Sequence, residues 1–230
     1  MRSVLPLLLV GTLFAVPARA QIDEEQLGAW YMYFFNTRIG DSRWGFQGDG
    51  QFRNWDMGGD LEQLLLRGGV TYSPGESGVR LTFGYANITT GEFGPGDDTV
   101  KEDRIYQEAL VPHRVAKRVY LNHRFRYEQR WVENQDFRTR FRYAIFVNVP
   151  LNQLDLSKGA VYLAFYDEIF VNGEQNIGDG RRVNYFDRNR LYGAVGYSLT
   201  DRLRLQAGIM RQTSENLSKN QFQLSLHHSF

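Results

Sequence analysis

The sequence predicts an all-β fold, an antiparallel transmembrane β-barrel of ten to twelve strands, with twelve preferred. Three observations lead to this prediction. Apolar and polar residues alternate with period two along nearly the whole chain, the alternating segments are long, and the N-terminus has the pattern of an export signal. With a mean hydropathy of -0.45 and no convincing helical period, the chain does not suit a bundle of membrane helices.

The first twenty residues predict a cleaved signal peptide. A basic start at Arg2 precedes an apolar stretch at 4–16, and the small residues Ala18 and Ala20 follow it. A membrane anchor would need ~20 apolar residues, more than this stretch supplies. We therefore expect cleavage after Ala20 and export to the bacterial outer membrane. The remainder, residues 21–230, shows no linker or shift in composition, so we expect a single barrel domain.

The alternation is clearest at 136–149, which predicts a strand with one apolar and one charged face. Its apolar face carries Phe137, Phe141, Tyr143, Ile145 and Val147, and the other face carries Arg138, Arg140 and Arg142. The same reasoning predicts strands near 27–37, 43–53, 61–72, 79–90, 102–111, 118–132, 136–149, 159–171, 186–199, 202–213 and 219–230.

The length of these segments favours a membrane barrel over a soluble one. Strands of soluble proteins most often have ~5–6 residues, whereas a tilted membrane-spanning strand needs ~9–11. Aromatic residues near the expected strand ends suit interfacial girdles: Trp30, Trp44, Tyr72, Tyr85, Trp131 and Tyr197. Because bacterial single-chain barrels have even strand numbers, we expect that one of the eleven segments is misassigned or that one strand is missing.

Composition limits the possible partners. Lys and Arg number 27 and Asp and Glu number 26, so the net charge is +1 and does not predict nucleic acid binding. The chain has no cysteine, which excludes disulfides and thiolate metal sites. We expect no cofactor and no metal site.

The polar faces of two consecutive strands predict an arginine-rich lumen. In a membrane barrel the apolar face meets lipid, so the charged face must point inward. The residues expected to line the lumen are Asp49, Arg104, Glu108, Arg124, Arg126, Glu128, Arg130, Arg138, Arg140, Arg142, Glu168 and Arg190. Two overlapping interpretations stay open: an ion-pair network that stiffens a small barrel, and a narrow channel that favours anions weakly.

Catalysis has little support in the sequence. His227 and His228 are adjacent and must face opposite sides of a strand, so they cannot share a metal. Ser225 and His227 fall on the same inner face and form the only plausible nucleophile and base. We assign no catalytic residue and expect no enzyme activity. The alternatives are a barrel enzyme acting on lipid or lipopolysaccharide and a soluble periplasmic barrel that binds a ligand.

Eight segments, in order along nearly all of the chain beyond Ala20, resemble the family of domain of unknown function 2490. They are AWYMYFFN at 29–36, WGF at 44–46, EQLLLRGGV at 62–70, RIYQ at 104–107, HRFRYEQRW at 123–131, VPLN at 149–152, YDEIF at 166–170 and DRNRLY at 187–192. The resemblance implies a porin-like outer-membrane barrel of a Gram-negative bacterium, with outer-membrane lipid as its surroundings, and it implies no specific activity.

The last strand is similar to the C-terminal signal that the barrel-assembly machinery reads during insertion. Phe222, Leu224, Leu226 and Phe230 share one face of this strand, and Phe230 is the final residue. His228 departs from the aliphatic or aromatic residue usual near that end. We expect the assembly machinery to be a transient partner, and the sequence identifies no soluble partner.

Overall fold

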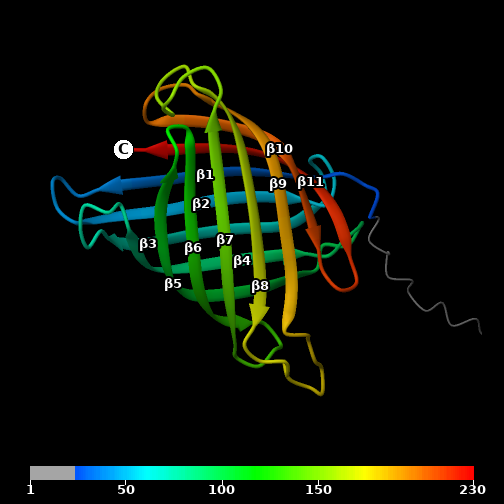
Figure 1. Ribbon diagram of the computed structural model, residues 1–230. Coiled ribbons are helices and arrows are strands. Elements are labelled where there is room, and N and C mark those ends of the chain that lie inside the picture. Colours follow the sequence, from blue (N-terminus) through cyan, green and yellow to red (C-terminus); the bar gives the residue numbers. More distant parts are fainter. Residues whose placement is uncertain (1–23) are drawn as a thin grey trace, which may run out of the picture.

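The computed structural model describes residues 24–230, so the predicted signal peptide at 1–20 lies outside the described residues. The described chain consists of strands and their connections (Figure 1). The strands are β1 (Gly28–Arg38), β2 (Trp44–Asn54), β3 (Leu61–Tyr72), β4 (Arg80–Gly91), β5 (Thr99–Val115), β6 (Val119–Val132), β7 (Arg138–Pro150), β8 (Val161–Asn172), β9 (Phe186–Ser198), β10 (Leu203–Thr213) and β11 (Ser218–Ser229). Within residues 24–230 no helix has the length and hydropathy to cross a bilayer.

The strands close into one barrel, which confirms the predicted all-β barrel class. Each strand pairs antiparallel with the next along the chain, and β1 closes the barrel by pairing parallel with β11, Gly28 opposite Gln221 and Asn36 opposite Ser229. The preference for twelve strands is therefore wrong. The even-number rule assumes that the first and last strands also run antiparallel, and a parallel closure permits eleven.

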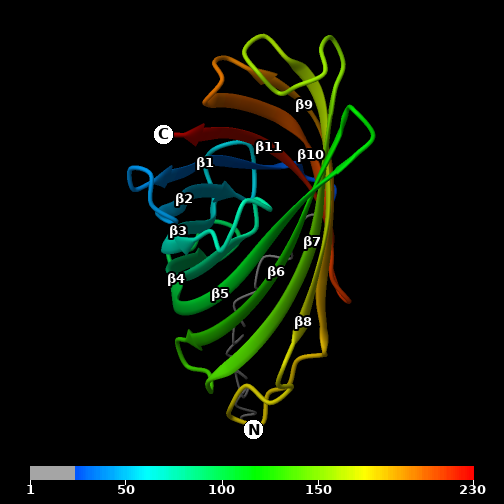
Figure 2. The same cartoon turned by 60° about the vertical axis from the view of Figure 1, so that its left-hand side comes forward.

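The parallel closure places the two chain ends at opposite rims of the barrel. We call the rim where β1 begins the N-rim and the rim where β11 ends the C-rim. The N-rim carries the connections at 55–60, 92–98, 133–137, 173–185 and 214–217, and the C-rim carries those at 39–43, 73–79, 116–118, 151–160 and 199–202. In Figure 2 the wall containing β1 to β4 and the wall containing β6 to β9 stand apart, with strongly tilted strands.

Strand β5 is longer than predicted, with 17 residues at Thr99–Val115. Its pairing with β4 ends where Leu110 faces Arg80, whereas its pairing with β6 continues to Val115 opposite Val119. Pro112 lies in this last part, where the strand has a partner on one side only. A proline without an N–H is tolerated at such an edge, so the β5–β6 hairpin extends beyond its neighbour β4.

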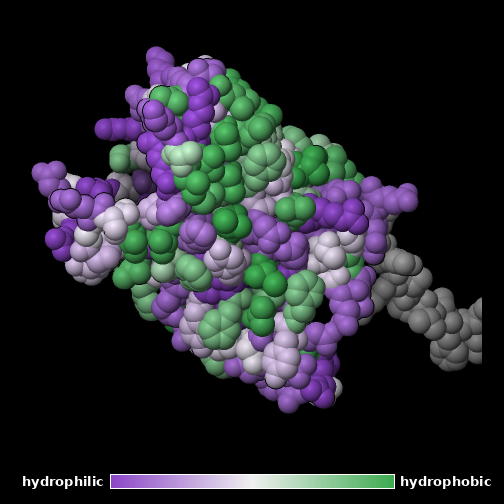
Figure 3. All heavy atoms as spheres, viewed as in Figure 1, coloured by the Kyte–Doolittle hydropathy of each residue, from purple (hydrophilic) through white to green (hydrophobic). Residues whose placement is uncertain are grey.

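The outer face of the barrel carries many of its large apolar side chains, and the inner face carries many of its charged ones. Large side chains on the outer face stay exposed, among them Phe83 at 61% and Leu191 at 58%. Figure 3 shows hydrophobic residues in patches on the outer face, with hydrophilic ones at the loops and between the patches. Glycines make room for two inward-pointing rings: a Cβ on Gly84 would lie 2.3 Å from the Tyr106 ring, and one on Gly196 would lie 2.2 Å from the Tyr162 ring.

Two of the predicted girdle residues do not belong to a girdle. Trp30 points into the barrel and is 2% exposed, lying opposite the buried residues Arg53 of β2 and Gln223 of β11. Tyr85 faces outward but lies in the middle of β4, where its hydroxyl donates to Asp103 Oδ1 at 2.5 Å. Trp44, Tyr72, Trp131 and Tyr197 do lie at or near strand ends.

Candidate functional site

All twelve residues expected in the lumen lie on the inner face. Eleven are buried, and the Arg124 side chain is 15% exposed. Four consecutive strands, β5 to β8, carry most of the charge. Their inner faces contribute the arginines Arg104, Arg124, Arg126, Arg130, Arg138, Arg140 and Arg142 and the glutamates Glu102, Glu108, Glu128 and Glu168. We call these eleven residues the Glu128 cluster.

Glu128 is the centre of this cluster. Its side chain is 1% exposed, and four arginines have a nitrogen within 4.0 Å of its carboxylate. Arg140 donates to Oε2 at 2.7 Å and Arg142 donates to Oε1 at 2.7 Å, while Arg104 and Arg126 lie at 3.6 and 3.8 Å. A buried carboxylate with this many cations stays ionised and ties three strands together.

Alternating charges close into a ring inside the barrel. From Glu128 the ring runs through Arg126, Glu108, Arg124, Glu168 and Arg142 back to Glu128. Arg124 joins Glu168 at 2.6 Å, and Arg142 joins it at 2.7 Å. Each charge has neighbours of opposite sign, which offsets the direct opposition of Arg126 and Arg142 across the β6–β7 pair.

Two further carboxylates flank the ring and form ion pairs. Glu102 accepts from Arg104 at 2.7 Å and from Arg130 at 2.5 Å, so one carboxylate serves two arginines. On β2, the Asp49 carboxylate accepts two hydrogen bonds from the Arg67 guanidinium, from Nε and from Nη2, each at 2.9 Å. Such bidentate pairs hold a guanidinium in one orientation.

The sequence-based expectation does not include several inward charges, among them Glu102, Arg67, Glu62 and Asp187. Glu102 lies two residues before Arg104 and so faces the same side of β5, and Arg67 lies on the inner face of β3. The alternation along the two strands therefore predicts both as inward residues. Glu62 and Asp187 could not be found in this way. Each is the extra residue where a strand register shifts, Glu62 between the pairs of Arg53 and Asn54 and Asp187 between those of Phe170 and Val171.

These two extra residues are acceptors inside the barrel. Glu62 accepts from Trp30 Nε1 at 2.8 Å, and Asp187 accepts from Arg140 at 2.8 Å. The Trp30 ring also lies under two guanidinium groups, Arg53 at 3.9 Å and Arg190 at 4.8 Å from the ring centre. The inward tryptophan is therefore part of the lumen's charge arrangement.

Across the lumen, the filling is mostly uncharged. A cluster of buried side chains from β1, β8, β9 and β10 consists of Trp30, Tyr162, Ala164, Tyr192, Ala194 and Met210. We call it the aromatic cluster. Tyr166 packs against it and hydrogen bonds Gln223 of β11, with the amide nitrogen 3.0 Å from the hydroxyl.

Two cavities lie inside the barrel, one towards each rim. The cavity of about 280 Å³ lies at the N-rim, where Arg138, Gln135 and Thr90 line it. The cavity of about 500 Å³ reaches the C-rim, where Asn36, Asn148 and Arg204 line it. The linings of both include Arg53, Arg67, Arg142 and Arg190. Arginine side chains therefore lie where the two cavities approach each other.

The Ser225 and His227 side chains meet on the inner face of β11. Ser225 Oγ lies 3.0 Å from His227 Nε2, and the imidazole stacks on Phe34 at 4.9 Å between ring centres. Both residues line the C-rim cavity. Among the described residues no carboxylate hydrogen bonds the other imidazole nitrogen, so the orienting group of a catalytic triad is missing.

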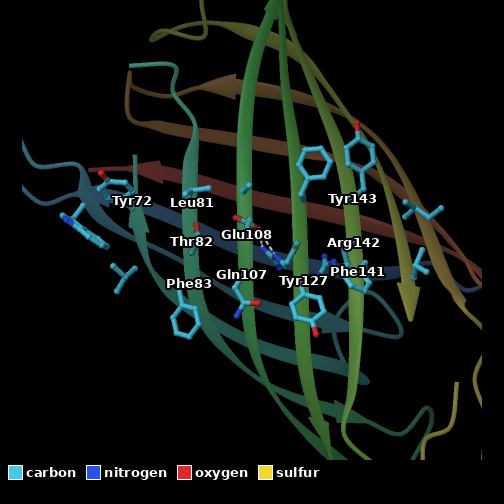
Figure 4. A pocket seen from close by; sticks show the side chains of 17 residues that line it. Tyr72, Leu81, Thr82, Phe83, Gln107, Glu108, Tyr127, Phe141, Arg142 and Tyr143 are labelled. Atoms are coloured by element: carbon cyan, nitrogen blue, oxygen red, sulfur yellow. Dashed lines mark hydrogen bonds and ion pairs between the residues drawn. The ribbon is translucent and has the colours of Figure 1, made fainter. Parts of the chain in front are cut away.

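A third hollow of about 870 Å³ lies on the outer face, over β2 to β8 (Figure 4). Outward-pointing side chains such as Phe83, Tyr127 and Phe141 line it, and Ala109 on β5 leaves space between the larger side chains of β4 and β6. Glu108 and Arg142 in Figure 4 belong to the inner face of the same wall. The groove surface is apolar and suits hydrocarbon chains.

The part of the chain that the structure describes holds no group of three or more metal-ligating side chains. A family model described as protein of unknown function (DUF2490) matches residues 27–223, which include ten complete strands and half of β11. No curated protein and no solved structure matches the chain.

Proposed function

Because the chain belongs to the DUF2490 family of proteins of unknown function, we propose that it is a small outer-membrane β-barrel. Its Glu128 cluster braces the lumen and leaves only a narrow path that favours anions. The proposal joins the two interpretations left open by the sequence, since an ion-pair network and a narrow path can occupy the same lumen.

The observation that carries the proposal is the inverted distribution of polarity. Phe83, Phe141 and Leu191 are each more than half exposed on the outer face, whereas Glu128 is 1% exposed inside. In water, a belt formed by the many large apolar side chains exposed on the outer face would far exceed the few hundred Å² that soluble monomers expose. In a bilayer the belt meets lipid and the closed sheet leaves no unpaired backbone edge. The same distribution argues against a soluble barrel that binds an apolar ligand inside.

The charge and size of the lumen favour a narrow path for anions. Seven arginines face four glutamates in the Glu128 cluster, so the excess charge is positive. Barrels of about eight strands are filled by side chains, and those of sixteen or more hold aqueous channels. With eleven strands, the barrel lies between these limits. We expect a small conductance or none.

The location is tested by fractionation and heat-modifiability. A folded outer-membrane barrel is extracted only by detergent, co-fractionates with outer-membrane lipid, and migrates differently on gels before and after boiling. Release of the folded protein into the aqueous periplasmic fraction without detergent would reject the membrane assignment and favour the soluble barrel.

Ion preference is tested by recording the purified protein in planar bilayers under a salt gradient. We expect a reversal potential with the sign that indicates a higher permeability for anions than for cations. A cation preference would contradict the arginine-lined path. No conductance in the wild type, together with a loss of thermal stability in Glu128→Ala, would assign the network a structural role alone.

A barrel enzyme acting on lipid is the second candidate, supported by the Ser225–His227 hydrogen bond in the C-rim cavity. A hydroxyl within hydrogen-bond reach of an imidazole is the first requirement of a serine nucleophile. The test is hydrolysis of phospholipid and lipopolysaccharide by the wild type and Ser225→Ala. Activity that disappears in Ser225→Ala would establish the enzyme, whereas equal product in both would reject Ser225 as its nucleophile.

A further inference from the structure

The N-rim cavity has an unusual balance of charge. Among the described residues that line it, nine are arginines and one, Glu102, is a carboxylate. The arginines come from β2, β3, β5, β6, β7 and β9, so they surround the cavity. Part of this charge is balanced by Glu128, Glu168, Asp49 and Asp187, which pair with lining arginines from outside the cavity surface.

Three arginines form a lateral row across neighbouring strands. Arg104 of β5 lies directly opposite Arg130 of β6, and Arg130 lies directly opposite Arg138 of β7. Like charges in directly opposed positions repel. Glu102 bonds Arg104 and Arg130 and makes no ion pair with Arg138. The row therefore keeps an excess of positive charge beside the cavity.

Three lining arginines form no ion pair within 4.0 Å in the described part of the chain, although Arg190 lies directly opposite Glu168 across the β8–β9 pair. Arg138 is 8% exposed, and its buried Nε has no hydrogen-bond partner. Arg53 donates only to the amide oxygens of Gln51 and Gln63. Arg190 donates only to that of Gln212. A buried guanidinium without a counter-ion is costly, and a bound anion removes this cost.

We propose that the N-rim cavity binds a phosphate group, either free phosphate or a phosphate ester. Guanidinium forks match phosphate oxygens bidentately, and a dianion balances more of the local charge than chloride does. The volume of about 280 Å³ is just below the range of pockets for drug-sized ligands, so it suits one small anionic group. The site deepens the proposed function and rests on it for a lumen that anions can enter.

The test is calorimetric titration of the folded protein in nonionic detergent at constant ionic strength set with sodium chloride. One arm uses inorganic phosphate and glycerol phosphate, and the other uses phosphatidic acid in mixed micelles. We expect saturable binding that Arg138→Gln and Arg190→Gln each weaken about tenfold or more, the usual effect of losing one charged hydrogen bond. The matched control, Arg204→Gln, removes an inward arginine that lines the other cavity, and we expect less than a twofold change.

Each result bears on the proposal. Sensitivity to Arg138→Gln in the solute arm identifies a solute phosphate, and sensitivity in the lipid arm alone identifies a headgroup. No binding in either arm, equal displacement by chloride, or an equal loss in Arg204→Gln would overturn the site. If the glutamine variants fail to show heat-modifiable folding, Arg138→Lys keeps the charge without the fork and is expected to weaken binding severalfold.

A second readout needs no variant. Phosphate that binds only the folded state raises the midpoint of thermal unfolding with concentration. An unchanged midpoint at saturating phosphate would overturn the site. Because both measurements use protein in detergent, they are independent of fractionation and conductance, so the phosphate site and the outer-membrane role can fail separately.

Discussion

The Glu128 cluster and the aromatic cluster lie within the same barrel and fill it by different means. Glu128 is surrounded by four arginines, and every charge in its ring depends on neighbours. Tyr162 and Met210 are equally buried and are held by packing and by a neutral hydrogen bond from Gln206 to the Tyr162 hydroxyl. The difference teaches that removing one member leaves an unpaired charge in the first cluster and a small void or an unpaired amide in the second.

The largest loss of folded protein is expected from removing most of β11, whose Gln223 bonds Tyr166 beside the aromatic cluster. Deleting residues 222–230 removes most of β11 and leaves β1 and β10 with open edges, which would face lipid in the proposed membrane barrel. Each unsatisfied backbone group there costs several kcal/mol. We expect no folded barrel in the outer membrane, as judged by protease resistance and heat-modifiability. A protease-resistant truncated protein in that fraction would contradict both the closure and the assignment of Phe222, Leu224, Leu226 and Phe230 to the insertion signal.

The second largest effect is expected in the Glu128 cluster. Glu128→Gln keeps the shape of the side chain but leaves Arg140 and Arg142 without this charge. Breaking a buried pair in this way costs about 3–5 kcal/mol of unfolding free energy. Urea titration in lipid vesicles measures it, with Glu76→Gln in an exposed loop as the control. A change equal to that of the control would mean that the ring does not stabilise the barrel.

A smaller effect is expected beside the aromatic cluster. Tyr166→Phe removes the hydroxyl that hydrogen bonds Gln223 and leaves a buried amide unsatisfied, which costs about 1–3 kcal/mol. Adding Gln223→Leu removes the orphaned amide, so we expect the double variant to regain stability in the same urea titration. In contrast, adding Arg140→Gln to Glu128→Gln does not restore stability, because Arg142 also depends on Glu128. An equal recovery of unfolding free energy in the two double variants would show that the two clusters do not differ in this respect.

The smallest effect is expected outside the barrel wall, in the loop between β2 and β3. Asp56 Oδ1 accepts from the backbone N–H groups of Gly58, Gly59 and Asp60 at 2.9, 2.6 and 3.1 Å, and these bonds lower the pKa of the Asp56 carboxyl. The stabilisation is present above the ordinary Asp pKa and is lost as the pH falls through the lower folded-state value.

NMR titration of the Gly58 and Gly59 amide shifts measures this dependence. We expect a midpoint below the ordinary Asp pKa of about 3.9, no titration in Asp56→Asn, and less than about 1 kcal/mol of stability because the carboxyl is exposed. A midpoint at or above the ordinary value would contradict the hydrogen-bonded loop.

Period-two alternation predicted much of this protein. Because side chains on a strand alternate between two faces, one register decision assigned Arg124 to Arg142 and their partners to the same side of the sheet. The sequence alone therefore determined the barrel class, the eleven strand segments and the inner positions of the twelve proposed lumen residues. The interior role of Glu102 was also within reach of the same rule.

The tertiary structure decided which strands pair, in which register, and therefore which side chains are neighbours across strands. The parallel pairing of β1 with β11 set the strand number, and no local pattern encodes which strands close a barrel. The inward position of Trp30 follows from its register with Arg53 of β2 and Gln223 of β11. Register shifts brought Glu62 and Asp187 inside against the alternation. The arginine row beside the N-rim cavity likewise requires the register between three strands. Alternation assigns a side chain to a face, but only pairing and register assign its neighbours, and those neighbours determine whether a buried charge is balanced.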